Sequence, residues 1–76
     1  MSIVKVYSTP TCPYCIRAKD YLKQKGVSFE NYDVSSDEEK LNEMMSVSGQ
    51  MGVPVIVVDN EVIVGFDRDR LEQLLS

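Results

Sequence analysis

Cys12-Pro13-Tyr14-Cys15 holds the only two cysteines among the 76 residues of this chain. The tetrapeptide follows a short apolar run, Ile3 to Tyr7, and it opens a pattern of helical spacing. Proline suits the first position of a helix, because the N–H that it lacks would have no partner there and its φ is already helical. The sequence therefore predicts a helix with Cys12 at its N-cap and Cys15 one turn further on, in a more buried place.

A cysteine at a helix start is suited to thiol–disulfide exchange, in which the attacking species is the thiolate. A helix N-terminus offers unpaired backbone N–H groups and the positive end of the peptide dipole, and both favour an anion. We interpret Cys12 as the residue that attacks a disulfide and Cys15 as the residue that resolves the mixed disulfide. Arg17 and Lys19 are interpreted as part of a solvated helix face.

Three other roles compete for the two cysteines. A structural disulfide across so short a loop would remove little chain entropy. A zinc site needs about four N or S ligands, and the chain has no histidine and no third cysteine, so we expect no metal site. A pair of buried, inert cysteines is the third alternative, and the intervening proline argues against it. A CxxC pair between a strand and a helix indicates a redox dithiol.

Length and charge restrict the partners of the protein. A chain of this length predicts a single domain, residues 1–76. A net charge of −4 and a pI near 4.6 argue against nucleic acid or an anionic membrane as a partner. No apolar run approaches the length of a membrane span, and the first residues lack the pattern of a signal peptide. We therefore expect a cytoplasmic protein, and in that compartment a cysteine pair is more often catalytic than structural.

Hydrophobic spacing and turn residues place the other elements. The expected strands are Ile3–Tyr7, Val27–Val34, Val55–Val58 and Glu61–Val64. The expected helices run from Pro13 to about Lys25 before Gly26, from the start at Ser35-Ser36-Asp37 to Gly49, and from a cap at Asp67 onward. The faces that these helices should bury carry Ala18, Tyr21 and Leu22; Leu41, Met44, Met45 and Ser48; and Leu71, Leu74 and Leu75. Asp59-Asn60 predicts a tight hairpin turn, and Gly65 should end the last strand.

The order β-α-β-α-β-β-α predicts an α/β fold. The first two strands are joined through a helix and should run parallel by a right-handed crossover, whereas the hairpin makes the last two antiparallel. We expect a mixed four-stranded sheet with helices on both faces. Ligand sites in such sheets gather at the C-terminal ends of parallel strands, and Cys12 should lie at that rim because it follows the first strand.

Six short motifs along nearly the whole chain match one known family. They are Tyr7-Ser8, Cys12-Pro13-Tyr14-Cys15, Arg17-Ala18-Lys19, Ser48-Gly49-Gln50, Val53-Pro54 and Gly65. Together they resemble a glutaredoxin, and the combination of CPYC with a downstream Val-Pro is specific, whereas CxxC alone does not separate glutaredoxin from thioredoxin. The resemblance implies the thioredoxin fold, with the Val53–Pro54 bond cis and facing the cysteines. The backbone of Val53 would then be an open strand edge for a peptide-like substrate.

The resemblance also implies the substrate, which is glutathione or a protein mixed disulfide that carries it. The family's glutathione contacts, transferred to this sequence, fall on Tyr14, Val53, Pro54, Gly65, Phe66 and Asp67. Glutathione is then a cosubstrate, and no tightly bound cofactor is expected. The partners would be disulfide-containing or glutathionylated proteins, and we expect a monomer. A role for Asp67 only as a helix cap stays open.

Several positions depart from the family pattern. Thr9 stands where many glutaredoxins have a lysine that pairs with a glutathione carboxylate. Gly52 replaces the threonine of the usual Thr-Val-Pro, and Val64 replaces the first of two glycines. Phe66 follows Gly65, and this Gly-Phe pair is more similar to the redoxins that serve ribonucleotide reductase and are recharged by thioredoxin reductase.

Two alternative functions therefore stay open beside glutathione-dependent reduction. The first keeps the chemistry of the dithiol and makes thioredoxin reductase the electron donor. The second is a binding function, in which two or more chains hold an iron–sulfur cluster through Cys12 and glutathione, as some glutaredoxins do. Proline after the first cysteine argues against the cluster within the family.

Overall fold

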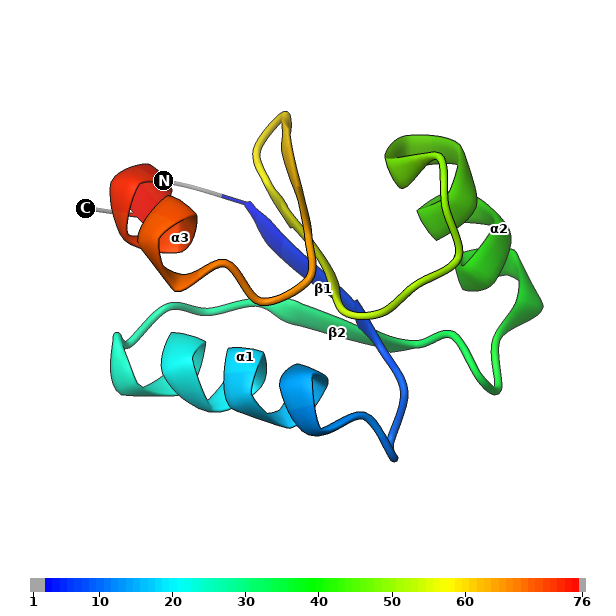
Figure 1. The fold of residues 1–76 in the computed structure, drawn as a ribbon, viewed down its shortest axis with the longest axis horizontal. Coiled ribbons are helices and arrows are strands. Elements are labelled where there is room, and N and C mark those ends of the chain that lie inside the picture. The colour runs from blue at the N-terminus through cyan, green and yellow to red at the C-terminus, as the bar shows by residue number, and fades with distance from the viewer. Residues whose placement is uncertain (1–2, 76) are drawn as a thin grey trace.

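The computed structural model describes residues 3–75. The strands and helices of this part of the chain are β1 (Val4–Ser8), α1 (Pro13–Gln24), β2 (Glu30–Asp33), α2 (Glu38–Ser48), β3 (Val55–Val58), β4 (Glu61–Val64) and α3 (Arg68–Leu75). Their order confirms the β-α-β-α-β-β-α prediction, and the path of the chain can be followed in Figure 1.

The four strands form one mixed sheet in the order β2-β1-β3-β4. The central strand β1 pairs in parallel with β2 and antiparallel with β3, and β3 pairs antiparallel with β4. Val6 in β1 lies opposite Asn31 on one side and Ile56 on the other. The predicted crossover and hairpin are thus both present, and β1 delivers the start of α1 to one end of the sheet.

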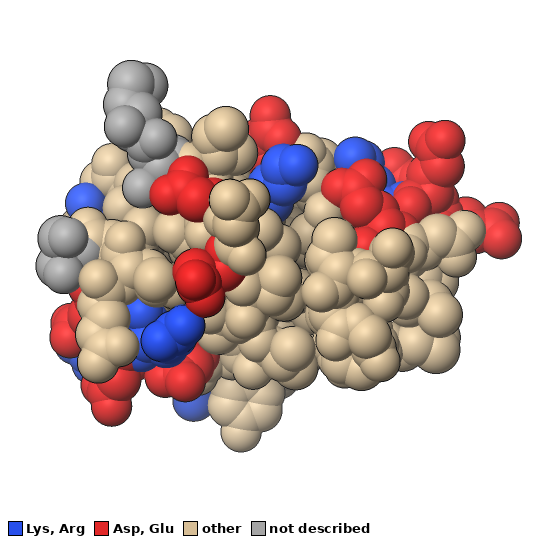
Figure 2. Space-filling model, turned by 90° about the horizontal axis from the view of Figure 1, so that it is seen from above, with Lys and Arg blue, Asp and Glu red and all other residues tan. Residues whose placement is uncertain are grey.

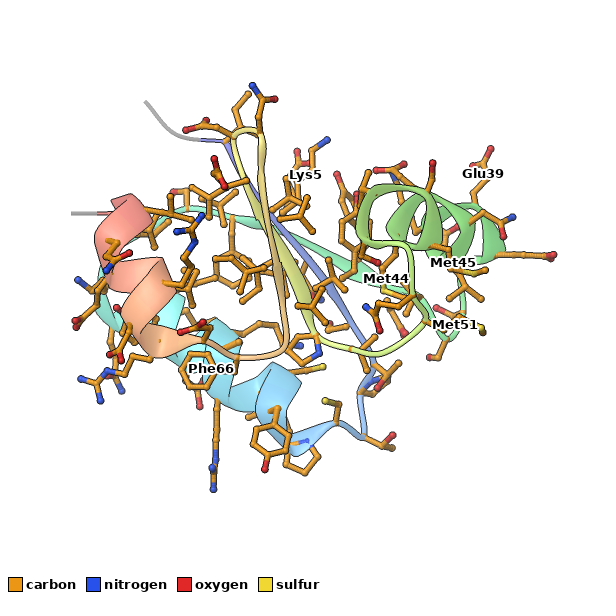
Figure 3. All side chains as sticks on the ribbon, turned by 45° about the horizontal axis from the view of Figure 1, so that its top comes forward. Lys5, Glu39, Met44, Met45, Met51 and Phe66 are labelled. Atoms are coloured by element: carbon orange, nitrogen blue, oxygen red, sulfur yellow. The ribbon has the colours of Figure 1, made fainter. Side chains whose placement is uncertain are left out.

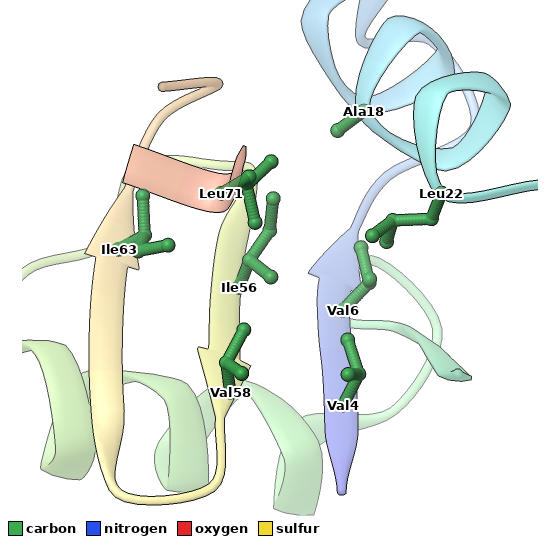
Figure 4. Close-up of a cluster of buried hydrophobic side chains, with 8 residues drawn as sticks. All are labelled: Val4, Val6, Ala18, Leu22, Ile56, Val58, Ile63 and Leu71. Atoms are coloured by element: carbon green, nitrogen blue, oxygen red, sulfur yellow. The ribbon is translucent and has the colours of Figure 1, made fainter. Parts of the chain in front are cut away.

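Helices α1 and α3 cover one face of the sheet (Figure 1). The buried cluster between them and the strands consists of Val4, Val6, Ala18, Leu22, Ile56, Val58, Ile63 and Leu71. Figure 4 shows Ala18 and Leu22 of α1 and Leu71 of α3 above the strand residues. The side chains of α1 that face the sheet, Ala18 and Leu22, are fully buried. This packing fixes the position of the helix start that carries the cysteines.

Helix α2 covers the opposite face with a smaller buried cluster of Tyr7, Val34, Met44 and Val55. Met44 is fully buried, but Met45 is 38% exposed, so the prediction that both methionines fill the core was wrong for Met45. Successive residues of a helix point about 100° apart, so when Met44 points directly at the sheet Met45 lies toward the side of the helix. Figure 3 shows Met44 near the sheet, Met45 on the outer part of α2, and Met51 in the loop after this helix.

Strand β2 is shorter than the sequence predicted. Pairing with β1 begins at Glu30 rather than at Val27. The N–H of Val27 donates instead to the carbonyl of Leu22, 3.0 Å away, and so completes the end of α1. Gly26 makes this reversal with φ 71°, a left-handed value that suits glycine. The segment from Val27 to Phe29 therefore connects the helix to the strand and packs against the core without pairing in the sheet.

The surface carries its acidic residues unevenly. Seen from above, acidic side chains gather over α2 at one end of the molecule, beside a large uncharged area (Figure 2). Asp37, Glu38 and Glu39 stand at the start of that helix, where the peptide dipole favours negative charge. None of the helices in residues 3–75 combines the length and the apolar character that crossing a bilayer requires.

Candidate active site

Helix α1 begins at Cys12, as the sequence predicted. Cys12 has an extended backbone with φ −90° and ψ 113°, and Pro13 is the first helical residue. The N–H of Cys15 donates to Sγ of Cys12 over 3.2 Å, which is the N-cap interaction usually made by a serine or aspartate oxygen. A backbone donor aimed at this sulfur stabilises negative charge on it. The fold thus places one sulfur of the pair at the start of a helix with a backbone donor directed at it.

The two thiols differ in their surroundings. Cys12 is half-buried, whereas Cys15 is fully buried, and both are free thiols. Burial, and next the hydrogen bond with Cys12, raise the pKa of the Cys15 thiol to about 11. At neutral pH the inner thiol therefore stays protonated and protected while the outer one is accessible. This asymmetry supports the order of attack that the sequence suggested.

The loop that leads into β3 faces the cysteines. The Val53–Pro54 peptide bond is cis, as the resemblance implied, and Pro54 is buried. The carbonyl oxygen of Val53 lies 3.9 Å from Sγ of Cys12. The backbone of Val53 and the outer thiol are therefore neighbours, although they are 41 positions apart in the sequence.

Tyr14 lies at the surface beside the cysteines. Its side chain is 60% exposed, and the guanidinium of Arg17 stands 5.8 Å from the centre of its ring. An exposed ring two residues after the outer cysteine can flank a bound thiol compound. Arg17 is in the solvated position that the sequence predicted.

The segment Gly65-Phe66-Asp67 links the site to α3. The N–H of Gly65 donates to the carbonyl of Pro54 over 2.8 Å, so the segment is tied to the loop that faces the cysteines. Phe66 packs on Tyr21 of α1 with ring centres 5.8 Å apart, beside α1 in Figure 3. Oδ1 of Asp67 accepts a hydrogen bond from the N–H of Arg70 at 3.1 Å, which caps α3.

The predicted site residues therefore fall into two groups. The described contacts bring together Cys12, Cys15, Val53, Pro54 and Gly65. Tyr14 contacts Arg17 of α1, Phe66 contacts Tyr21 of α1, and Asp67 caps α3, so this second group makes these contacts away from the two sulfurs. Within residues 3–75, no group of three or more histidine, cysteine, aspartate or glutamate side chains could hold a metal ion.

The sequence did not predict the contacts that Gln50 makes beside the site. Its side-chain amide bonds both backbone polar groups of Gly52, the residue before Val53. In the sequence Gln50 served only as one letter of a family motif. The signal that could have revealed it is the glycine that stands at position 52 where a threonine is usual.

Comparisons with known proteins agree with this geometry. The family model described as Glutaredoxin matches residues 4–63. The chain is 45% identical over 74 residues to an uncharacterized glutaredoxin-like protein in the rubredoxin operon of Clostridium pasteurianum, with 97% of this chain and 99% of the relative covered. It is 43% identical over 67 residues to Glutaredoxin 3 of Escherichia coli K12, and this match covers 88% of this chain and 81% of that protein.

A solved structure supports the same assignment. The crystal structure of a glutaredoxin from Archaeoglobus fulgidus matches with a TM-score of 0.89 and 30% identity, over 99% of this chain and 87% of that one. The family model and these relatives cover most of the chain, including the helix start, both thiols and the loop before β3. The chain therefore belongs to the glutaredoxin family and is a thiol–disulfide oxidoreductase.

Proposed function

We propose that this glutaredoxin reduces protein disulfides and glutathione mixed disulfides with its Cys12/Cys15 dithiol, and that glutathione supplies its electrons. The observation that carries the proposal is the setting of Cys12. Its sulfur accepts a hydrogen bond from the N–H of Cys15 at 3.2 Å and lies 3.9 Å from the carbonyl of Val53. A nucleophile and an open backbone edge stand side by side, which is what a short peptide disulfide needs.

The reaction proceeds by two exchanges of sulfur bonds. The Cys12 thiolate attacks one sulfur of the substrate disulfide, the S–S bond breaks, and the second substrate sulfur leaves as a thiolate that takes a proton from water. With a protein disulfide, Cys15 then loses its proton and attacks Sγ of Cys12, which releases the other substrate thiol. The substrate gains two electrons, and the protein is left with a Cys12–Cys15 disulfide.

Glutathione closes the cycle in this proposal. One glutathione thiolate attacks the Cys12–Cys15 disulfide and forms a mixed disulfide at Cys12, and a second removes it as oxidised glutathione. When the substrate is glutathionylated, Cys12 takes the glutathione directly and Cys15 is not required. The exposed ring of Tyr14 and the backbone of Val53 are the proposed contacts of its cysteinyl part.

The γ-glutamyl end of glutathione would bind at Gly65-Phe66-Asp67. The N–H groups at the start of α3 and the second oxygen of Asp67 are the polar groups that we assign to it. An aspartate at a helix start can cap the helix with one oxygen and meet an ammonium group with the other. Asp67 would in this way serve both the helix and the substrate.

A second donor, thioredoxin reductase, is favoured by three features of the proposed glutathione contacts. The N–H of Gly65 is already bonded to Pro54, and Oδ1 of Asp67 is already bonded to Arg70. Thr9 adds no charge at the place where many relatives have a lysine. The polar groups left for glutathione are thus fewer than in the usual family pattern, while the dithiol chemistry is unaffected.

The electron donor is decided by reducing the oxidised protein in two parallel assays. One contains NADPH, glutathione reductase and glutathione, and the other contains NADPH and thioredoxin reductase alone. Faster NADPH consumption in the first supports our proposal. Reduction only in the second would replace glutathione with thioredoxin reductase as the physiological donor.

The roles of the two cysteines are tested with Cys12→Ser and Cys15→Ser. We expect Cys12→Ser to lose all disulfide reduction. Cys15→Ser should keep activity on a glutathionylated protein and lose it on a protein disulfide, because only the second route needs a resolving thiol. Activity retained in Cys12→Ser would refute the assignment of the attacking residue.

A further inference from the structure

The side-chain amide of Gln50 forms two hydrogen bonds with the backbone of Gly52, and we call this pair of bonds the clamp. Oε1 of Gln50 accepts a hydrogen bond from the N–H of Gly52, and Nε2 donates to the carbonyl of the same glycine over 3.0 Å. Nε2 also lies 3.4 Å from Oγ of Ser48, which donates to the carbonyl of Met44 at 2.6 Å. The clamp is therefore connected to the last turns of α2, where Met44 is fully buried.

Gly52 stands directly before the residue that faces the outer thiol. A single planar amide can bond the N–H and the C=O of one residue only when both point to the same side, as they do in an extended chain. The chain bends at Val53, where a following proline disfavours the helical conformation. Holding Gly52 toward Gln50 therefore fixes the chain on one side of this bend, which places the carbonyl of Val53 3.9 Å from Sγ of Cys12.

We propose that Gln50 is a positioning residue, which holds the backbone of Val53 toward Sγ of Cys12 so that a peptide-like disulfide can pair with it. The inference rests on the proposed role of Val53 as a substrate-binding edge. The distance of 3.9 Å between the carbonyl of Val53 and Sγ of Cys12 is the geometry that the clamp maintains. Gln50 itself does not touch the reacting sulfurs in this account.

The absence of a side chain at Gly52 makes room for the clamp. A Cβ placed on Gly52 would lie 2.7 Å from Oε1 of Gln50 and 3.7 Å from Cδ of the same side chain. A Cβ at this position requires the amide of Gln50 to shift, so we expect a larger residue to weaken the clamp. The departure from the family's threonine at position 52 and the presence of Gln50 are thus coupled features of this chain.

The test compares two disulfides that differ in having a peptide backbone. Oxidised glutathione can pair with Val53, whereas dithiodipyridine has no backbone and reports only on the reactivity of Cys12. The pre-reduced protein is mixed with each compound, and second-order rate constants are measured for the wild type, Gln50→Ala, Gln50→Glu, Gly52→Ala and the Gln50→Ala/Gly52→Ala double variant. Gln24→Ala, at the exposed far end of α1, is the matched control.

We expect Gln50→Ala to react roughly tenfold more slowly with oxidised glutathione, a loss on the scale of one hydrogen bond. Its rate with dithiodipyridine and that of Gln24→Ala with both compounds should stay within about twofold of the wild type. Gln50→Glu keeps the acceptor for the N–H of Gly52 but lacks the donor for its carbonyl, so we expect an intermediate loss. Gly52→Ala should match Gln50→Ala, and the double variant should be no slower than either single variant.

Equal losses with both disulfides would overturn the proposal, because they would mean that Gln50 supports the site in general. Unchanged rates with glutathione would overturn it as well, and so would additive losses in the double variant. A failure of the proposed function has a different signature. In that case the wild type reacts no faster with dithiodipyridine than the Cys12→Ser variant does.

Discussion

Replacing Tyr7 with phenylalanine isolates the hydrogen bond that ties α2 to the sheet. Tyr7 lies in β1 with 1% of its surface exposed, and its hydroxyl donates to Oε1 of Glu43 in α2. Oε2 of the same carboxylate accepts from Nζ of Lys40 at 3.1 Å. The change Tyr7→Phe removes one oxygen atom and keeps the ring that packs against Met44 and Val55. It therefore tests the polar contact without opening a cavity.

The magnitude follows from the two ends of the bond. A hydrogen bond to a charged group contributes about 1.5–3 kcal/mol to stability. Glu43 is partly solvent-exposed and keeps Lys40, so its carboxylate is not left unpaired when the hydroxyl is removed. We therefore expect the variant to lose about 1–1.5 kcal/mol of unfolding free energy. With an m-value near 1 kcal/mol per molar urea, the midpoint should fall by roughly 1 M.

The pH dependence provides a second readout. The hydroxyl of Tyr7, and next Lys40, lower the pKa of Glu43 below its ordinary value of 4.5. A carboxylate with a lowered pKa in the folded state contributes stability that is present above the unfolded value and is lost as the pH falls through the folded one. The gap between wild type and Tyr7→Phe should thus be full at pH 7 and shrink as the pH is taken below 4.5.

Urea unfolding followed by circular dichroism at pH 7 and at several lower pH values measures both effects. Tyr32→Phe is the matched control, because its hydroxyl donates to Glu30 at the exposed edge of the sheet. We expect that control to stay within about 0.5 kcal/mol of the wild type. A Tyr7→Phe protein with the wild-type midpoint, or a loss that is the same at every pH, would refute this account of the bond.

Three further predictions concern the core, the inner thiol and the last helix. Met44→Ala should lower the unfolding free energy by about 2–5 kcal/mol because Met44 is fully buried, whereas Met45→Ala should stay within about 0.5 kcal/mol; urea titration of both variants checks this. Iodoacetamide at pH 7 should modify Cys15 only after unfolding, as read by peptide mass spectrometry. Because the pKa of Cys15 is raised from 9.0 to about 11, the unfolding free energy of the reduced protein should fall between pH 9 and pH 11. It should fall less in Cys15→Ala, where the raised pKa of Tyr7 still contributes a loss above that group's ordinary value of 10.0. Asp67→Ala should cost about 1 kcal/mol by loss of the α3 cap, and Asp67→Ser should restore that stability. If Asp67 also binds glutathione, the rate of glutathione-dependent reduction should fall equally in Asp67→Ala and Asp67→Ser. If that rate falls only in Asp67→Ala, Asp67 serves as a helix cap alone.

Elements bounded by turn residues were predictable from the sequence. The strands β3 and β4 have the predicted bounds, because Asp59-Asn60 leaves room only for a two-residue hairpin turn and Gly65 ends the second strand. Gly26 and Gly49 both adopt φ 71° at helix ends, which is the conformation that their positions required. At these places the local conformational preference and the global fold agree.

Features that depend on tertiary contacts were less predictable. Periodicity alone leaves the rotation of α2 open by one residue, and packing against the sheet selects Met44 over Met45. The late start of β2 depends on the hydrogen bond from Val27 to the carbonyl of Leu22, and strand-like composition in residues 27–29 does not reveal it. The approach of Val53 to Cys12 came from the family resemblance, since no pattern relates residues so far apart.

A comparison of the three described helix starts bears on the role proposed for Cys12. Each helix begins with a side chain that accepts a hydrogen bond from the N–H three residues later: Cys12 from Cys15 at 3.2 Å, Asp37 from Lys40 at 3.2 Å, and Asp67 from Arg70 at 3.1 Å. Aspartate is among the best N-cap residues, and cysteine is not among the preferred ones. The N-cap of α1 is therefore weaker than the N-caps of α2 and α3. The backbone N–H that meets a carboxylate oxygen at α2 and α3 meets a sulfur at α1, and this sulfur is the one that the proposed reaction uses.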